Sequence, residues 1–305
     1  MSEKHISVLL NECIENLNLK DDSVIVDCTL GYGGHSSEIL KRIPKGFLYA
    51  FDQDIEAIKY SQDLLSKVGN NFKIIKSNFK NIKEELKKIG VTKVDGILYD
   101  LGVSSPQLDE AERGFSFHED ARLDMRMDES NPLDAFEVVN TYSYDKLNEI
   151  IKKYGEEKYS SSIARGIINN RPIETTLELV EVIKESVPEK YRREKHPARK
   201  TFQAIRIEVN DELNVLEESL KSALDILNDG GRICVITFHS LEDKICKDIF
   251  KNVSEVDETL KHLPVIPREY MPKFKMIKSI KPSDKELISN NRSRSAKLRI
   301  IEKEG

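Results

Sequence analysis

Short apolar runs alternate with longer amphipathic segments over the first hundred residues of the chain. The runs are rich in β-branched and aromatic residues and predict buried strands at 23–27, 47–51, 72–75 and 94–99. Between them, apolar positions recur every three or four residues and predict helices at 35–43, 55–68 and 82–89. Strands that alternate with helices through short connections predict a parallel sheet with helices on both faces.

The pattern changes near residue 104. Residues 104–127 are rich in charge, serine and glycine and predict an ordered loop. Helical periodicity without strands follows and predicts helices at 133–139, 144–154, 160–169 and 177–186. The earlier pattern then returns, with helices predicted at 208–227 and 241–253 and strands at 232–238, 274–280 and 296–301. We therefore predict an α/β, Rossmann-like domain from residues 1–104 and 201–305, interrupted by an all-helical insertion at 105–200.

Composition narrows the class of protein. The chain has 305 residues, of which 39% are hydrophobic and 33% charged, so it is very polar but can still build a core. It has no apolar run of roughly 18 residues and no signal-type N-terminus, so we expect a cytoplasmic protein without a membrane partner. Cys13, Cys28, Cys234 and Cys246 form no C-x-x-C pair, which predicts buried reduced thiols and no metal site.

The net charge of −5 is unevenly distributed. Segments 184–206 and 261–299 are strongly basic, and the rest of the chain is strongly acidic. Two basic segments on an acidic body are typical of a protein that contacts a polyanion at chosen places. Two solvated surface segments would give the same pattern, and charge alone does not decide between these interpretations.

Three strand ends carry candidate cofactor-binding residues. A glycine turn, Gly31-Tyr32-Gly33-Gly34-His35, follows the first predicted strand, and Asp52 follows the second. Glycines allow close approach of the backbone to a ligand, and an acid after the second strand can accept hydrogen bonds from both ribose hydroxyls. Phe79, after the third strand, could stack on adenine. The third glycine of a dinucleotide motif is absent, which favours S-adenosylmethionine over a pyrophosphate cofactor.

Asp100 follows the fourth predicted strand and is the candidate catalytic group. A carboxylate that accepts a hydrogen bond from an exocyclic base amine can stabilise the charge that develops on that amine during methyl transfer. Asp100 could instead hold the amino-acid part of the cofactor, and the sequence leaves both roles open. His239 and Ser240 follow the fifth strand and either contact the substrate or cap the next helix.

Basic residues next to serine, asparagine and aromatic residues are the candidate RNA contacts. Such segments suit phosphates and stacked single-stranded bases, although a solvated face remains the alternative. The predicted RNA-binding residues are Arg199, Lys200, Arg206, Arg292 and Arg294.

Several longer segments resemble one known family. They are DLGVSSPQLD at 100–109, RGFSF at 113–117, LDMRMD at 123–128, FQAIRIEVNDEL at 202–213, FHSLED at 238–243 and RSRSAKLR at 292–299. The resemblance is to the RsmH (MraW) family and extends from His5 to Arg299. Two departures are visible: residues 117–122 lack a glycine-proline pair, and Asn291 stands where proline is common.

The resemblance implies a function and a set of site residues. It implies an S-adenosylmethionine-dependent methyltransferase, releasing S-adenosylhomocysteine, that modifies the N4 amine of a cytidine in the decoding region of 16S rRNA within the small ribosomal subunit. The helical insertion would recognise the substrate. Positions that match the family's cofactor contacts are Gly33, Gly34, His35, Asp52, Phe79, Asp100 and Gln107.

Three other functions compete with this one. The first is an amino-methyltransferase of another RNA or of DNA. The second is a nicotinamide-dependent dehydrogenase, which the missing glycine disfavours, and the third is an RNA-binding factor without catalysis. The sequence does not determine the oligomeric state, so a homodimer stays open.

Overall fold

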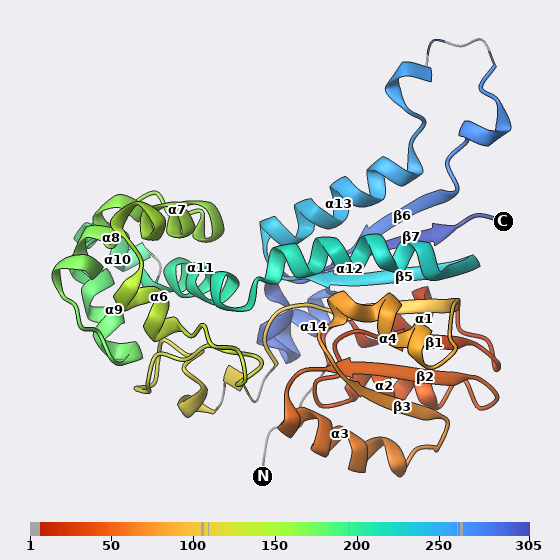
Figure 1. Cartoon of the computed structure of the whole chain (residues 1–305), viewed down its shortest axis with the longest axis horizontal. Helices are drawn as coiled ribbons and strands as arrows, with labels where there is room; N and C mark the ends of the chain where they lie inside the picture. The colour runs from red at the N-terminus through yellow and green to blue at the C-terminus, as the bar shows by residue number, and fades with distance from the viewer. Residues whose placement is uncertain (1–6, 105–106, 109, 195, 261, 263–264) are drawn as a thin grey trace. The chain divides into compact units, whose positions relative to one another are not determined.

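A computed structural model describes residues 7–104, 107–108, 110–194, 196–260, 262 and 265–305 (Figure 1). The chain forms two compact units. The sheet unit contains the chain up to Gly102 and again from Leu213 onward, and the helical unit is Val103–Glu212. The predicted insertion, 105–200, ends inside a helix of the helical unit. This end is misplaced because the sequence predicts that the helix starts only at residue 208.

The sheet unit is built on a seven-stranded sheet with the order β3-β2-β1-β4-β5-β7-β6. Its strands are β1 Val24–Asp27, β2 Phe47–Asp52, β3 Phe72–Lys76, β4 Val94–Asp100, β5 Leu227–Thr237, β6 Phe274–Ile280 and β7 Lys297–Lys303. The first five are parallel, whereas β7 is antiparallel to both β5 and β6. The strand order reverses between β1 and β4, which is where open α/β sheets bind ligands. The predicted α/β, Rossmann-like fold class is confirmed.

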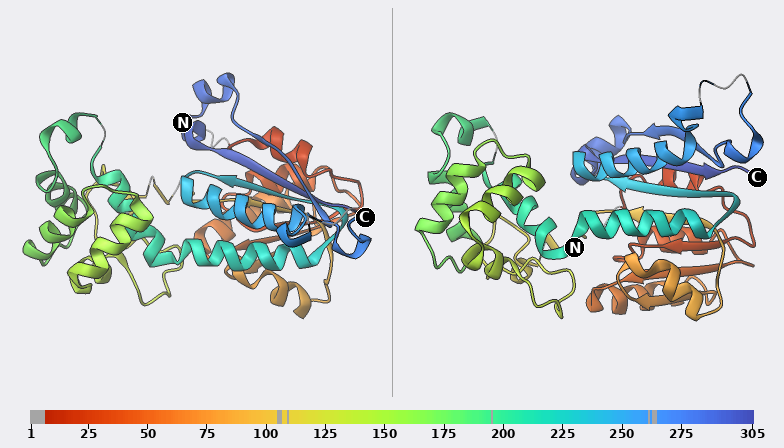
Figure 2. Two further views of the ribbon diagram at one scale, coloured as in Figure 1. Left: turned by 90° about the horizontal axis from the view of Figure 1, so that it is seen from above. Right: turned by 45° about the horizontal axis from the view of Figure 1, so that its top comes forward.

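Helices cover both faces of this sheet (Figure 2). They are α1 Leu10–Asn16, α2 Gly34–Leu40, α3 Ile55–Ser66, α4 Ile82–Lys88, α12 Glu212–Ile226 and α13 Ser240–Ser254; α14 Asp284–Ser289 has no buried residue and belongs to neither core. Successive residues of a strand enter opposite cores: Ile25 packs with α1 and α2, whereas Val26 packs with α4 and α12. Burial on both faces explains why the strands read as continuous apolar runs.

Two features of the C-terminal half differ from the prediction. The helix predicted at 208–227 is two helices, α11 Ala198–Asn210 and α12, separated by Asp211 with a φ of 51°. Gly230 and Gly231, which follow the predicted end of that helix, lie inside β5, where the β4–β5 register shifts between Val94 and Gly96. The short helices α1 and α14 were not predicted, because one or two turns give little periodicity.

The helical unit has a core of its own. Its helices are α6 Ala135–Thr141, α7 Tyr144–Gly155, α8 Ser160–Asn169, α9 Thr176–Glu185, α10 Glu189–Glu194 and α11. The helices predicted at 133–139, 144–154, 160–169 and 177–186 are confirmed to within about two residues as α6 to α9. Side chains fix the helix starts: Thr175 and Glu178 form a capping box at α9.

The segment predicted as an ordered loop is held by charged side chains. Arg126 donates to the Asp124 carboxylate at 2.7 Å and to the carbonyl oxygens of Glu129 and Asn131 at 2.7 and 2.9 Å. Buried or half-buried guanidinium groups need several acceptors, and here the backbone supplies them. The LDMRMD segment at 123–128 is therefore a structural element of the helical unit.

Two residues, Leu101 and Gly102, separate the end of β4 from the boundary of the sheet unit. The amide of Leu101 donates to the carbonyl oxygen of Ile236 at 3.1 Å, and its side chain is buried in the core that contains Val26. Gly102, the last residue of this stretch, has a φ of 94°. Such a φ favours glycine and lets the chain leave the sheet directly after Leu101. Among the described residues, no helix is long and apolar enough to cross a membrane.

Candidate active site

The ends of β1 and β4 are tied together by a small hydrogen-bond network. The buried carboxylate of Asp27 accepts hydrogen bonds from the Ser36 hydroxyl at 2.6 Å and from the Thr29 amide at 3.0 Å. The Thr29 hydroxyl accepts one from the Asp100 amide at 2.6 Å. Burial raises the pKa of Asp27, and the two donors oppose that rise. Asp27 thus fixes the glycine turn and α2 relative to the end of β4.

Asp27 is the last residue of the first predicted strand, and the sequence alone assigns it no role. Its signal in the sequence is an acid at the last position of a buried strand, directly before a glycine turn. An acid there either faces a ligand or orders the turn, and only the fold shows that Ser36 and Thr29 occupy it.

The glycine turn has two distinct structural requirements. Gly33 precedes α2 with a φ of 74°, which L side chains rarely adopt. Gly34 lies so close to Ser7 that a Cβ would approach the Ser7 hydroxyl oxygen to 2.0 Å. A side chain at position 34 would therefore require the Ser7 hydroxyl to rotate away. Contact between these glycines and a cofactor stays a prediction.

Asp52 locks the glycine turn to the end of β2. Its Oδ2 accepts a hydrogen bond from the Gly31 amide at 2.8 Å, and its Oδ1 accepts one from the Asp54 amide at 2.9 Å. Burial raises the pKa of Asp52 to about 6, against the lowering effect of these hydrogen bonds. A carboxylate oxygen has a second lone pair, so both oxygens can still accept from a ribose.

Asp100 is the most electrostatically strained group of this region. Its Oδ1 is buried and has no hydrogen-bond partner among the described residues. Burial raises the pKa of Asp100 to about 8, and repulsion by Asp27 and Glu242 adds to the rise. A buried acceptor without a donor destabilises a fold by about 1–3 kcal/mol. A ligand with an N–H donor would satisfy this oxygen.

His35 faces the other oxygen of Asp100. The imidazole is 5% exposed, its Nε2 lies 3.1 Å from the Val8 carbonyl oxygen, and its Nδ1 lies 3.6 Å from Asp100 Oδ2. A carbonyl oxygen can only accept, so Nε2 carries a hydrogen. In the neutral imidazole Nδ1 is then an acceptor directed at the Asp100 carboxyl. At 3.6 Å the two groups do not form a hydrogen bond, but they are close enough to interact electrostatically.

Phe79 is held as a rigid platform after β3. It begins the 3-10 helix η1, Phe79–Asn81, and packs edge-to-face against Tyr99 with ring centroids 5.6 Å apart. The Ser219 hydroxyl contacts both residues: it donates to the Phe79 carbonyl oxygen at 2.9 Å and lies 2.8 Å from the Tyr99 hydroxyl. The ring is only half-buried, so the predicted stacking on adenine is sterically feasible.

His239, and not Ser240, is the residue that caps α13. Its Nδ1 accepts from the Glu242 amide at 3.4 Å, and Glu242 Oε2 accepts from the Phe238 amide at 2.7 Å. His239 Nε2 lies 3.1 Å from Glu242 Oε1. The predicted capping serine is thus corrected to a capping histidine, and Ser240 opens the helix. The contacts found here favour a structural role for His239.

The SLED and KLR segments meet across the sheet unit. Asp243 accepts from Arg299 at 2.7 and 2.9 Å and from Lys297 at 3.0 Å. These hydrogen bonds, that of Arg299 first, lower the pKa of Asp243. This pair joins α13 to β7, so these parts of the FHSLED and RSRSAKLR segments serve the fold.

The predicted RNA-binding residues fall into two groups. In the sheet unit, Arg292 and Arg294 are exposed on the 3-10 helix η5, Asn291–Ser295. In the helical unit Arg199 is exposed, whereas Lys200 donates to the Glu156 carbonyl oxygen at 2.6 Å.

Arg206 binds within the helical unit. It forms a two-point ion pair with Glu212 at 2.7 and 2.9 Å, and both side chains are largely buried. Its guanidinium group therefore serves the structure of α11, which the charge pattern could not reveal.

Gln107 also belongs to the helical unit. It is 8% exposed, and its amide oxygen accepts from the Ser104 amide at 3.0 Å. Ser105, Pro106 and Asp109 of the same segment lie outside the described residues. The predicted cofactor contact of Gln107 stays a prediction.

All four cysteines are free and buried. Burial raises the pKa of Cys234 to about 12 and those of the other three well above the usual value. They are inert thiols, and the predicted buried reduced state is confirmed.

Known proteins give a consistent picture. The model of the MraW methylase family matches residues 2–304. The protein named Ribosomal RNA small subunit methyltransferase H from Exiguobacterium sibiricum is 56% identical over 306 residues, 98% of each chain. Among solved structures, an rRNA methylase from Streptococcus thermophilus is similar, with a TM-score of 0.44 and 13% identity over 100% of this chain and 99% of the other. A precorrin-6y C5,15-methyltransferase from Geobacter metallireducens gives a TM-score of 0.45 and 12% identity over 100% and 93%.

The two structural similarities are too weak to bear on function, but the sequence match covers nearly the whole chain. The resemblance noted in the sequence is thereby confirmed, and a dehydrogenase is excluded. The chain belongs to the MraW methylase family.

Proposed function

We propose that the chain transfers the methyl group of S-adenosylmethionine to the N4 amine of a cytidine in small-subunit (16S) rRNA. Family membership and the name of the relative at 56% identity support a methyltransferase of ribosomal RNA. The observation that carries the proposal is the buried Oδ1 of Asp100, which has no donor among the described residues at the carboxyl end of β4. This is the acceptor that a poor amine nucleophile needs.

The residues around the strand ends fit the cofactor. Asp52 retains two lone pairs toward a ribose, and Phe79 offers a half-buried ring beside it. S-adenosylmethionine, when bound, supplies a methyl group attached to a sulfonium sulfur. The methyl group is transferred without the electron pair of the S–C bond, which stays on sulfur. The remaining requirement on the protein is to align the amine and exclude water from it.

Asp100 performs the proton step. The unpartnered oxygen of Asp100 accepts a hydrogen bond from the amine and orients its lone pair toward the methyl group. When the N–C bond forms, the nitrogen carries an extra proton, which passes to this carboxylate. His35 Nδ1 lies 3.6 Å from the other oxygen, beyond hydrogen-bond distance, and would interact with this carboxyl group only electrostatically. A pKa of about 8 suits a group that must accept a proton near neutral pH.

The direct test measures methyl transfer from labelled S-adenosylmethionine to purified small ribosomal subunits, naked rRNA and DNA in parallel. Mass spectrometry of the digested nucleosides should show N4-methylcytidine. Asp100→Asn should lower the rate by a hundredfold or more, because an amide cannot accept the proton. Asp225→Asn, which changes an exposed acid paired with Lys83, is the matched control. Preference for DNA, or a different methylated atom, would refute the proposal.

The finer substrate is part of the same proposal. It places the target in the decoding region of the assembled small subunit, in the cytoplasm, with the helical unit and the exposed Arg292 and Arg294 contacting rRNA. Mapping of rRNA modifications in cells lacking the gene should reveal one missing methyl group on a cytidine of that region. Complete modification in those cells would contradict it.

A further inference from the structure

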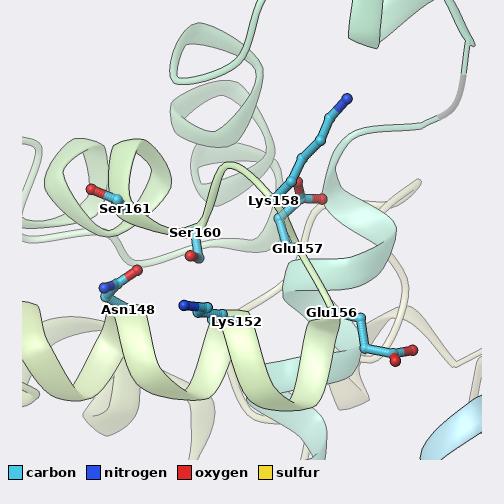
Figure 3. A pocket seen from close by; sticks show the side chains of 7 residues that line it. All are labelled: Asn148, Lys152, Glu156, Glu157, Lys158, Ser160 and Ser161. Carbon is cyan, nitrogen blue, oxygen red and sulfur yellow. The ribbon is translucent and has the colours of Figure 1, made fainter.

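The helical unit contains a pocket that the proposed chemistry does not use. It has a volume of about 440 Å³ and lies between α7 and the start of α8. The residues that line it are Asn148, Lys152, Glu156, Glu157, Lys158, Ser160 and Ser161. In Figure 3 the polar ends of Asn148, Lys152 and Ser160 face the same space, so two helices contribute groups to one site.

The donors of this pocket suit an anion. Ser160 is 5% exposed, and its hydroxyl has no hydrogen-bond partner within the described part of the chain. The amide groups of Ser161 and Ser162 have no backbone acceptor there either, and the Tyr159 side chain does not cap α8. An uncapped helix start next to an ammonium group is a favourable place for a phosphate. Lys152 is exposed and has no carboxylate within ion-pair distance among the described residues.

One acceptor in the pocket distinguishes the ligand further. Oδ1 of Asn148 is buried without a hydrogen-bond partner among the described residues. Asn148 and Lys152 are four residues apart and lie on the same face of α7. A phosphate offers no hydrogen to this oxygen, but a hydroxyl next to a phosphate does. A ribose with its 2′-hydroxyl supplies both groups in one nucleotide.

Two glutamates and two lysines line the pocket, so its formal charges balance. Glu157 is 1% exposed, and its oxygens accept from the Tyr159 amide at 2.9 Å and from the Tyr191 hydroxyl at 2.6 Å. Glu156 turns its side chain away from the pocket (Figure 3). Lys158 lies over the rings of Tyr159 and Tyr191, at 4.9 and 5.0 Å, and adds positive charge at the rim.

We propose that this pocket binds one ribose-phosphate of the RNA backbone, with the phosphate on Lys152, Ser160 and the start of α8, and the 2′-hydroxyl on Asn148. The inference rests on the proposed RNA substrate. It assigns the pocket a role in holding RNA, separate from methyl transfer. Because only the sugar and phosphate are recognised, the contact carries no base preference.

Binding of a labelled single-stranded rRNA fragment to the full-length protein tests the phosphate contact. Lys152→Gln should weaken binding about fivefold at low salt and lower the slope of log affinity against log salt by about one. Lys153→Gln is the matched control, because this neighbour is exposed but does not line the pocket. Equal losses of RNA affinity in the two variants would overturn the proposal, because they would show that only the general positive charge of the surface attracts RNA.

Two further measurements test the sugar and the source of the phosphate. Asn148→Ala should lower the preference for RNA over DNA of the same sequence by about threefold, since the 2′-hydroxyl loses its acceptor. An unchanged preference would overturn the assignment of a ribose. Displacement of the RNA by an equal concentration of cytidine 5′-monophosphate would instead assign the pocket to a free nucleotide and overturn the RNA assignment.

The proposed role of the pocket and the proposed function can be refuted independently. Ser160→Ala removes a hydroxyl that is proposed to bind the phosphate. Because this residue is buried, the thermal midpoint of the variant is measured alongside its RNA affinity, whereas Lys152→Gln changes only an exposed side chain. A protein that binds RNA through Lys152 but transfers no methyl group would contradict the proposed function and support the pocket. Equal methylation rates and equal RNA affinities in the Lys152→Gln and wild-type proteins would contradict the pocket and support the proposed function.

Discussion

Asp100, the proposed catalytic residue, illustrates how a buried acid weakens the fold that contains it. The carboxyl group lies near two other carboxylates, Asp27 and Glu242, and one of its oxygens lacks a donor among the described residues. An unfolded aspartate titrates near 3.9, so the native state holds this proton to a much higher pH. The native state therefore binds more protons than the unfolded state between about pH 4 and pH 8.

The free energy of unfolding should consequently decrease as the pH rises through that window. Asp100→Asn should remove the contribution of Asp100 to this decrease. At pH 8 the variant should be more stable than wild type by roughly 1–3 kcal/mol, and at pH 4 the two should agree to within about 0.5 kcal/mol. Urea denaturation at the two pH values measures this. Asp52, with a pKa of about 6, titrates in both proteins and cancels from the difference. A stability difference that does not depend on pH would contradict the prediction.

The sequence predicts site residues when their position follows from strand ends alone. Asp52 and Asp100 each end a strand, and the structure places both at the same edge of the sheet. The roles of Asp27 and His35 depend on partners brought together by the fold: Ser36 and Thr29 for the first, and Val8 for the second. The same holds for Arg206, because its pairing with Glu212 depends on the left-handed residue Asp211.

At the scale of elements, α13 depends on an unusual cap. Histidine is not among the residues that most often cap helices, yet His239 and Glu242 form both halves of a capping box. If capping is its role, His239→Asn should keep stability and activity close to wild type, since asparagine accepts from the same amide. His239→Ala should lower the free energy of unfolding by about 1 kcal/mol.

Chemical denaturation and methyl transfer separate the two roles of His239. A catalytic histidine would lose activity equally in the Asn and Ala variants while stability followed the cap. Loss of methyl transfer in a stable His239→Asn protein would therefore contradict the capping role.

Long amphipathic helices and buried apolar runs were predictable, whereas of the short helices α2, α4 and α6 were predicted and α1, α10 and α14 were not. Periodicity identified α3, α7, α8 and α9, because an amphipathic face persists over ten residues or more. The break at Asp211 and the register shift in β5 escaped, because a single backbone conformation leaves no periodic signal. Glycine pairs signal an irregularity but do not distinguish a helix end from a bulge.

For the whole molecule, the decisive feature is that each unit encloses its own core. The buried cluster of the helical unit draws only on residues between Phe115 and Val209. A fragment of residues 103–212 should therefore fold alone and unfold in a single cooperative transition, with a free energy of about 5 kcal/mol or less for its size. Circular dichroism during urea denaturation measures this. A fragment that lacks a cooperative transition would show that its core needs the sheet unit.

The order of the two units along the chain was readable from the change of pattern near residue 104 and its reversal after residue 200. The boundary itself was less clear, because α11 reads as basic and polar at its start and as amphipathic only later. Composition marks where a kind of structure changes, whereas the boundary is set by which core the apolar face of a helix joins.

Leu101 has a mechanical consequence for the reaction. Its hydrogen bond to Ile236 and its buried side chain anchor the residue that directly follows Asp100, and the freely rotating glycine comes only after it. A change of backbone conformation at Gly102 therefore need not displace the Asp100 carboxylate, because Leu101 between them is held by the sheet and its core.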